Sequence, residues 1–108
     1  MKLVILESPY AGDIEKNLTY ARECVRDSLS RGEAPIASHL LYTQEGILDD
    51  SKPEERTQGI DAGLAWAIVA DLHVFYVDLG MSKGMDYGIN AAEKLGLPYE
   101  IRKIREEG

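Results

Sequence analysis

Four short stretches expected to be strands alternate along the chain with three segments expected to be helices, and this alternation limits the folds that the chain can adopt. The first stretch, KLVILES at the amino terminus, is a continuous apolar run. Such a run is typical of a strand that is buried on both faces of a sheet. The stretch LHVFYVDL, at residues 72–79, is the richest in β-branched and aromatic residues. This composition also predicts a strand.

Three further segments are expected to be helices, the first of them from the helical spacing of its apolar residues. Asp13 is a natural N-cap for the first of them, and Gly32 is positioned to stop it. Ser51 and Glu54 form a capping-box pattern at the start of the second. The helices are expected at residues 13–31, 53–69 and about 83–95, and the remaining two strands at residues 34–38 and in PYEIRKI near the end.

The expected order is strand, helix, strand, long loop, helix, strand, helix, strand, with residues 39–52 as the long loop. Strands that alternate with helices pair in parallel through right-handed crossovers. The sequence therefore predicts an α/β fold, a three-layer sandwich around a small, mostly parallel sheet of the Rossmann or flavodoxin type. At 108 residues, the chain is expected to form a single domain over residues 1–108.

Composition excludes several classes of function. A net charge of −7 argues against a general nucleic-acid binder, which needs clustered Lys and Arg. The single cysteine, Cys24, excludes an internal disulfide and falls on the apolar face of a predicted helix, so a buried thiol is expected. No apolar run approaches the roughly 18 residues of a membrane span. We therefore predict a cytoplasmic protein that binds neither nucleic acid nor membrane.

Three loops, at residues 8–13, 38–42 and 78–84, are candidates for ligand binding, because ligands of parallel sheets bind at the carboxyl ends of the strands. Two of them, SPYAGD and SKGMDYG, lead into a helix whose free N–H groups and dipole favour an anion or a polar ligand. Neither contains a Walker or dinucleotide glycine pattern, and an ordinary capped turn is the alternative interpretation. The residues expected to bind a ligand are Ser8, Tyr10, Gly12, Asp13, His39, Ser82, Gly84 and Met85.

The two histidines, His39 and His73, are expected to have different roles. His39 follows the second strand, where it could hydrogen-bond a ligand or transfer a proton, although a structural role is the alternative. His73 lies inside a predicted strand and is expected to contribute to packing. The sequence has no cysteine or carboxylate cluster at metal-ligand spacing, so neither a metal nor a cofactor is expected.

Taken together, three stretches resemble the nucleoside 2-deoxyribosyltransferase-like superfamily, which includes deoxynucleoside 5′-monophosphate N-glycosidases. They are SPYAGDIEKNLTYAR, APIASHLL and ADLHVFYVDLGMSKGMDYGINAAEKLG. The last is the most specific and resembles the pattern S-x-G-x-x-Y-E followed by a helix. Ser82, Gly84 and Tyr87 match its first three fixed positions.

The resemblance implies chemistry at the bond between a base and deoxyribose, whose oxocarbenium-like transition state is stabilised by carboxylates. It places the attacking glutamate at position 88, which is Gly88 here, and a second carboxylate at position 63, which is Gly63. No catalytic residue is therefore assigned, and His39 and Asp86 remain as candidates. Asp86 lies on a different helix face from position 88, and a repositioned carboxylate could also come from Asp13, Asp49, Asp50 or Asp78.

Three functions follow from this interpretation. The first is a protein that binds a nucleoside or nucleotide and lacks the usual nucleophilic glutamate. The second is an active N-glycosidase or deoxyribosyltransferase that uses a repositioned carboxylate. The third is an oligomeric scaffold or adaptor. The resemblance also implies a homodimer or larger homo-oligomer, with a small-molecule nucleoside or nucleotide as the ligand.

Overall fold

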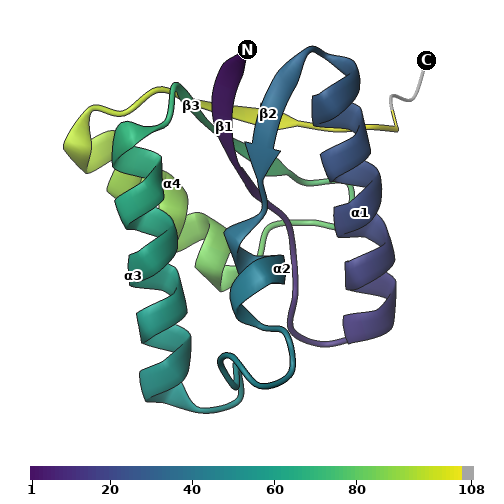
Figure 1. Ribbon diagram of the computed structural model, residues 1–108, viewed down its shortest axis with the longest axis vertical. Helices are drawn as coiled ribbons and strands as arrows, with labels where there is room; N and C mark the ends of the chain where they lie inside the picture. Colours follow the sequence, from purple (N-terminus) through teal and green to yellow (C-terminus); the bar gives the residue numbers. More distant parts are fainter. Residues whose placement is uncertain (106–108) are drawn as a thin grey trace.

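Four strands form one parallel sheet with the order β2-β1-β3-β4 in the computed structural model, which describes residues 1–105 (Figure 1). This arrangement confirms the predicted α/β fold. The strands are β1 (Lys2–Glu7), β2 (Glu33–Ile36), β3 (Leu72–Tyr76) and β4 (Tyr99–Arg102), and the helices are α1 (Ile14–Ser30), α2 (Ser38–Tyr42), α3 (Pro53–Val69) and α4 (Lys83–Leu95).

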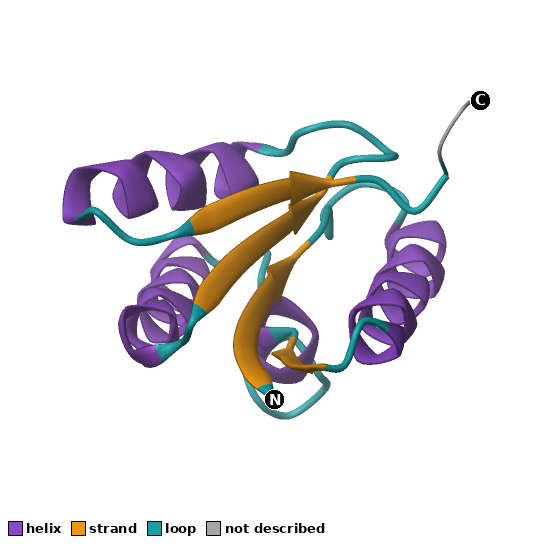
Figure 2. Ribbon diagram, turned by 90° about the horizontal axis from the view of Figure 1, so that it is seen from above, coloured by secondary structure: helices purple, strands orange, loops and turns teal. Residues whose placement is uncertain are grey.

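The helices cover both faces of the sheet (Figure 2). Helix α1 lies on one face, and helices α3 and α4 lie on the other. Successive side chains of a strand point to opposite faces, so Val4 and Leu6 of β1 contribute to the α1 side, while Glu7 points to the other. The alternation along β1 thus directs one apolar set to the core and one carboxylate toward helices α3 and α4.

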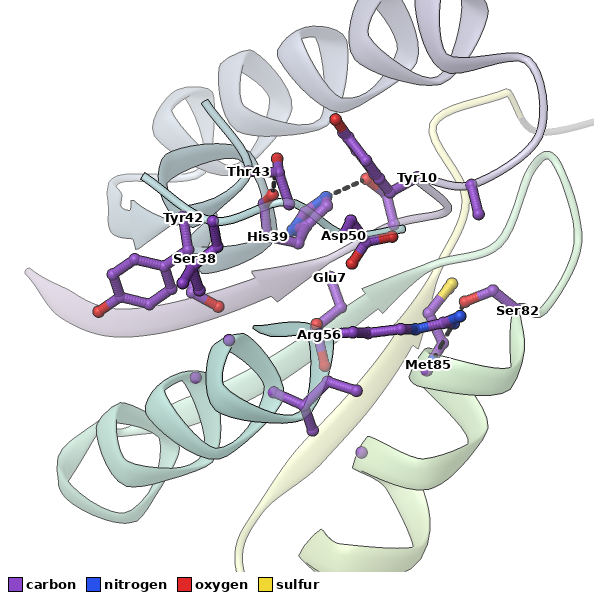
Figure 3. A pocket seen from close by; sticks show the side chains of 18 of the residues that line it. Glu7, Tyr10, Ser38, His39, Tyr42, Thr43, Asp50, Arg56, Ser82 and Met85 are labelled. Atoms are coloured by element: carbon purple, nitrogen blue, oxygen red, sulfur yellow. Dashed lines mark hydrogen bonds between the residues drawn. The ribbon is translucent and has the colours of Figure 1, made fainter. Parts of the chain in front are cut away.

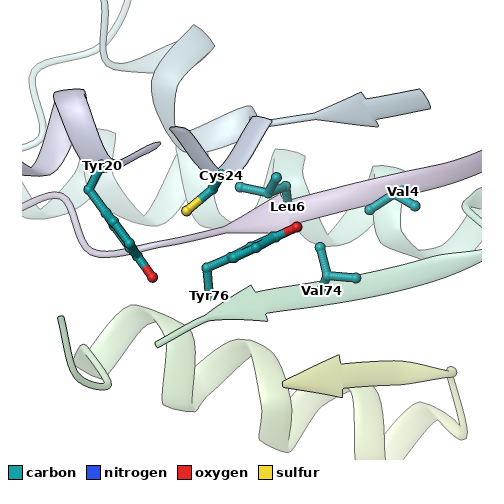
Figure 4. Close-up of a cluster of buried hydrophobic side chains, with 6 residues drawn as sticks. All are labelled: Val4, Leu6, Tyr20, Cys24, Val74 and Tyr76. Atoms are coloured by element: carbon teal, nitrogen blue, oxygen red, sulfur yellow. The ribbon is translucent and has the colours of Figure 1, made fainter. Parts of the chain in front are cut away.

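The larger core cluster lies between α1 and the sheet (Figure 4). Cys24 is fully buried there, as the sequence predicted. Burial raises the pKa of its thiol to about 12, which keeps the sulfur protonated and unreactive. The other buried members are Val4, Leu6, Tyr20, Val74 and Tyr76.

The structure confirms the N-cap predicted for α1 but not the capping box predicted for α3. Asp13 caps α1 by accepting a hydrogen bond from the Lys16 N–H at 3.2 Å. The capping box predicted for α3 is wrong, because the Ser51 hydroxyl donates instead to the Asp49 carboxylate at 2.6 Å. The N-cap of α3 is Lys52, which makes no side-chain capping bond. A nearby aspartate outcompetes the helix end for the serine hydroxyl.

Helix α2 corrects the prediction of a loop over residues 39–52. The N–H groups of Leu40 and Leu41 both bond to the Ala37 carbonyl, at 3.0 and 3.1 Å, and begin a short helical turn. Strand β2 consequently ends before Ser38, earlier than predicted. Within residues 1–105, no helix has the length and apolar character needed to cross a membrane.

Candidate functional site

A cavity of about 130 Å³ lies beyond the carboxyl ends of strands β1 and β3, among helices α2, α3 and α4 (Figure 3). The chain leaves β1 toward α1 on one face of the sheet and leaves β3 toward α4 on the other. These opposite directions make the gap between β1 and β3 the topological switch point, where ligands of open α/β sheets bind. The fold therefore places the cavity where a ligand site is expected.

The structure brings together side chains from all three loops singled out in the sequence. Gly12 instead lines a neighbouring, more open depression, and Asp13 caps α1 outside both hollows. Asp86 lies on the exposed side of α4 and is not part of the cavity wall. The predicted ligand-binding residues that line the cavity are Ser8, Tyr10, His39, Ser82, Gly84 and Met85.

His39 belongs to helix α2 rather than to the predicted loop, and its ring reaches back toward the end of β1. Its Nε2 atom lies 2.8 Å from Ser8 Oγ, and Ser8 is itself buried. Within residues 1–105, the buried Nδ1 atom has no hydrogen-bond partner. Burial lowers the pKa of His39, so the ring is neutral near pH 7 and can accept a proton, or donate one hydrogen bond and accept another.

The start of helix α4 forms a second polar wall of the cavity. Ser82 is the N-cap, and its hydroxyl accepts a hydrogen bond from the Met85 N–H at 3.2 Å. The first backbone bond of the helix runs from the Asp86 N–H to the Ser82 carbonyl. The N–H groups of Lys83 and Gly84 precede that bond and have no partner within the helix. Together with the helix dipole, they favour a negatively charged group.

Arg56 lines the cavity from helix α3 and is not among the site residues predicted from the sequence. Its side chain extends into the cavity toward the start of α4 (Figure 3). Among residues 1–105, it has no ion-pair partner. The helical spacing carries a signal that could have found it, because one face of α3 presents Arg56, Gly59, Ile60, Gly63 and Leu64 to the cavity.

Glu7 is a second cavity residue that is not among those predicted from the sequence. It ends β1, lines the cavity, and places its Oε2 atom 3.2 Å from His73 Nε2. His73 is 2% exposed and stacks on Phe75, with the ring centroids 4.3 Å apart. It therefore packs in the sheet, as predicted, and also holds a cavity carboxylate. Within residues 1–105, no group of three His, Cys, Asp or Glu side chains could hold a metal ion.

Gly88 and Gly63 both lie on the cavity wall, where the family resemblance implied carboxylates. A Cβ atom at position 88 would lie 2.8 Å from Glu7 Oε2 and 3.0 Å from Phe75 Cε2. A Cβ atom at position 63 would lie 2.8 Å from Ser38 Oγ. At both positions, a polar side chain from a neighbouring element occupies the space that a side chain would need.

Comparisons with known proteins agree with this architecture. The fold is similar to that of a 2-deoxyribosyltransferase from the psychrotolerant bacterium Bacillus psychrosaccharolyticus, with a TM-score of 0.64 over 98% of this chain and 75% of that chain. The two sequences are 20% identical, a level at which the similarity concerns the fold. No curated protein matches the sequence. The family model described as a domain of unknown function, DUF7768, matches residues 2–102, and the chain therefore belongs to this family.

Proposed function

We propose that this protein binds a nucleoside or nucleotide in the cavity at the carboxyl edge of its sheet. The observation that carries the proposal is the convergence of Ser8, His39 and Ser82 on one cavity at the switch point of the sheet. The fold similarity to a 2-deoxyribosyltransferase supports the class of ligand. The nucleophilic glutamate that the resemblance to the nucleoside 2-deoxyribosyltransferase-like superfamily implies at position 88 is absent, because this residue is Gly88.

The polar groups of the cavity suit the two ends of such a ligand. Arg56 and the start of α4 supply positive charge and N–H donors for a phosphate. Ser8 and His39 supply neutral hydrogen-bonding groups for sugar hydroxyls. In a protein of net charge −7, Arg56, which has no ion-pair partner among residues 1–105, is a specific attraction for an anionic group rather than part of a general basic surface.

Calorimetric titration with deoxynucleoside 5′-monophosphates and with the corresponding deoxynucleosides tests this proposal. Arg56→Gln removes the guanidinium, and we expect it to weaken monophosphate binding about 10-fold or more, because hydrogen bonds to charged groups contribute about 1.5–3 kcal/mol. Binding of the uncharged deoxynucleosides should change little.

The matched control is Arg22→Gln, which makes the same chemical change on the exposed surface of α1. It should leave both affinities unchanged. The proposal fails if no deoxynucleoside or deoxynucleotide binds to the unmodified protein. An equal loss of monophosphate affinity in both variants would also contradict it, because the effect would then reflect net charge rather than a cavity contact.

We also propose that the protein forms a homodimer or larger homo-oligomer. The carboxyl-terminal half of α3 carries exposed apolar side chains, with Trp66, Ile68 and Val69 being 52%, 57% and 69% exposed. Exposed apolar patches of this kind mark association surfaces. Light scattering should give a mass above that of one chain, and Val69→Lys should reduce it. A monomer at all concentrations would contradict this part of the proposal.

A further inference from the structure

The carboxylate of Glu7 stands in the place where a side chain at position 88 would begin. The two residues are far apart in the sequence, on β1 and α4, but a Cβ atom at position 88 would lie only 2.8 Å from Glu7 Oε2. Glycine therefore leaves room for this carboxylate, and a larger residue would displace it. This contact explains why the interior of the helix carries a glycine at position 88, although glycine is a poorer helix former than alanine.

The other carboxylates on the cavity wall are less suited to act on a ligand. Both oxygens of Glu55 are engaged, one by the Asp49 N–H at 3.0 Å and the other by Lys52 Nζ at 3.5 Å. Asp50 lies on the loop before α3 and makes no side-chain hydrogen bond within residues 1–105. Glu7, in contrast, is held on the end of a central strand by a buried histidine.

Glu7 is held in place by a neighbouring side chain and also lines the cavity. The Glu7 side chain is 21% exposed and that of His73 is 2% exposed, so His73 holds the carboxylate from inside the protein. The stacking of His73 on Phe75 restricts the histidine ring. A reactive group whose position is fixed by packed neighbours is better oriented than one on a mobile side chain.

We propose that Glu7 is the catalytic carboxylate that releases the base from a ligand bound in this cavity, and that Gly88 leaves the space that the Glu7 side chain occupies. This inference rests on the proposed binding of a nucleoside or nucleotide. Glu7 takes the role that the family resemblance gives to position 88, but it enters the cavity from β1 rather than from α4. His73 acts as a positioning residue for Glu7.

The reaction consists of two displacements at the anomeric carbon C1′. In the first, a Glu7 oxygen bonds to C1′ while the bond from C1′ to the base nitrogen breaks, and the base keeps the electron pair and takes a proton from solvent. In the second, water attacks C1′, the ester bond to Glu7 breaks, and the carboxylate leaves with its electron pair. The proton of the attacking water returns to solvent. The net reaction is hydrolysis to free base and deoxyribose or its phosphate.

Glu7→Gln tests the assignment, because glutamine retains the size of the side chain and removes its negative charge. Base release from deoxynucleoside 5′-monophosphates would be followed by chromatography, and binding would be followed by calorimetry on the same preparations. We expect release to fall about 100-fold or more, the range typical of removing a group that acts on the transition state. The dissociation constant should change less than about 3-fold, because the ground state makes little use of that charge.

Glu93→Gln is the matched control, because it makes the same chemical change on the exposed surface of α4. It should leave release at the unmodified rate. Mass spectrometry of the acid-quenched unmodified protein should show a sugar adduct on the peptide that contains Glu7, a result that a merely structural role would not give. Circular dichroism of Glu7→Gln checks that the variant is folded.

The outcomes separate this inference from the proposed function. If the unmodified protein binds deoxynucleotides but releases no base, the role of Glu7 is overturned and the binding function stands. If Asp50→Asn abolishes release while Glu7→Gln retains it, the carboxylate is Asp50 and the inference fails. If no deoxynucleoside or deoxynucleotide binds, both proposals fail.

Discussion

Replacing Gly88 with glutamate is expected to lower the free energy of unfolding by about 1–2 kcal/mol, although glutamate is the better helix former. The new Cβ atom would lie 2.8 Å from Glu7 Oε2 and 3.0 Å from Phe75 Cε2, and Phe75 is fully buried. The Glu7 carboxylate can rotate away, but the packed ring cannot. A second carboxylate beside Glu7 adds like-charge repulsion. These costs exceed the helix-propensity gain of less than about 1 kcal/mol.

Removing Glu7 at the same time should recover part of the loss. In the double variant Glu7→Ala/Gly88→Glu, the carboxylate oxygen that faces the new Cβ is gone, and only the contact with Phe75 remains. We expect this variant to be more stable than Gly88→Glu and to release base faster than Glu7→Gln, because a carboxylate again reaches the cavity. Chemical denaturation and the base-release assay measure the two effects.

Gly84→Glu is the matched control for the stability measurement. It lies on the same helix, but a Cβ atom there would approach only Ser82 Oγ, at 4.0 Å. An acidic residue in the first turn is also favoured by the helix dipole, so stability should be unchanged or slightly higher. If Gly84→Glu and Gly88→Glu destabilise the protein equally, the loss at position 88 does not come from its close contact with Glu7. The explanation given for the glycine at position 88 would then be wrong.

Replacing Arg102 with leucine should lower the free energy of unfolding by about 3–5 kcal/mol, more than Gly88→Glu does, because it leaves a buried charge without its partner. Arg102 Nη2 lies 2.6 Å from Glu33 Oε2, and Nη1 lies 2.7 Å from Glu33 Oε1. The Ser28 hydroxyl also donates to Glu33 Oε1, at 2.7 Å. This pair joins β2 to β4, the two edge strands of the sheet.

The pH dependence of unfolding gives this prediction a second readout. The hydrogen bonds from Arg102, helped by the Ser28 hydroxyl, lower the pKa of Glu33 from 4.5 to about 2. A lowered pKa in the folded state means that the pair stabilises fully above pH 4.5 and that this contribution is lost as the pH falls toward 2. Arg102→Leu should therefore flatten the stability profile across that acid range.

Urea denaturation of three proteins measures the effect: the unmodified chain, Arg102→Leu, and the double variant Glu33→Gln/Arg102→Leu. The double variant should be more stable than Arg102→Leu, because it no longer buries an unpaired carboxylate. An Arg102→Leu protein that loses less than about 1 kcal/mol would show that solvent or another group compensates the charge, as it does for exposed pairs.

The element order could be predicted from the sequence because the buried strands are short apolar runs and α1 shows a helical spacing of its apolar residues. KLVILES predicted β1, and Asp13 correctly marked the start of α1. Helix α2 could not be predicted, because five residues, Ser38–Tyr42, are too few to display a helical period. The capping box failed because Ser51 had a closer acceptor in Asp49.

The three loops of the candidate site could also be identified from the sequence, since parallel strands place their carboxyl ends at one edge. Glu7 could not, because a carboxylate that ends a strand gives no indication of which side chain it faces across the sheet. Its partner His73 and the space at Gly88 come from β3 and α4. Contacts between distant elements depend on strand register and helix packing, which a single sequence does not encode locally.

A crystal structure of the protein soaked with a deoxynucleoside 5′-monophosphate would show where the ligand binds and which side chains contact it. We predict that the ligand occupies the cavity at the ends of β1 and β3, with its phosphate at Arg56 and the start of α4 and its C1′ atom facing Glu7. A ligand bound outside this cavity, or a cavity that stays empty at saturating ligand, would overturn the proposed binding site.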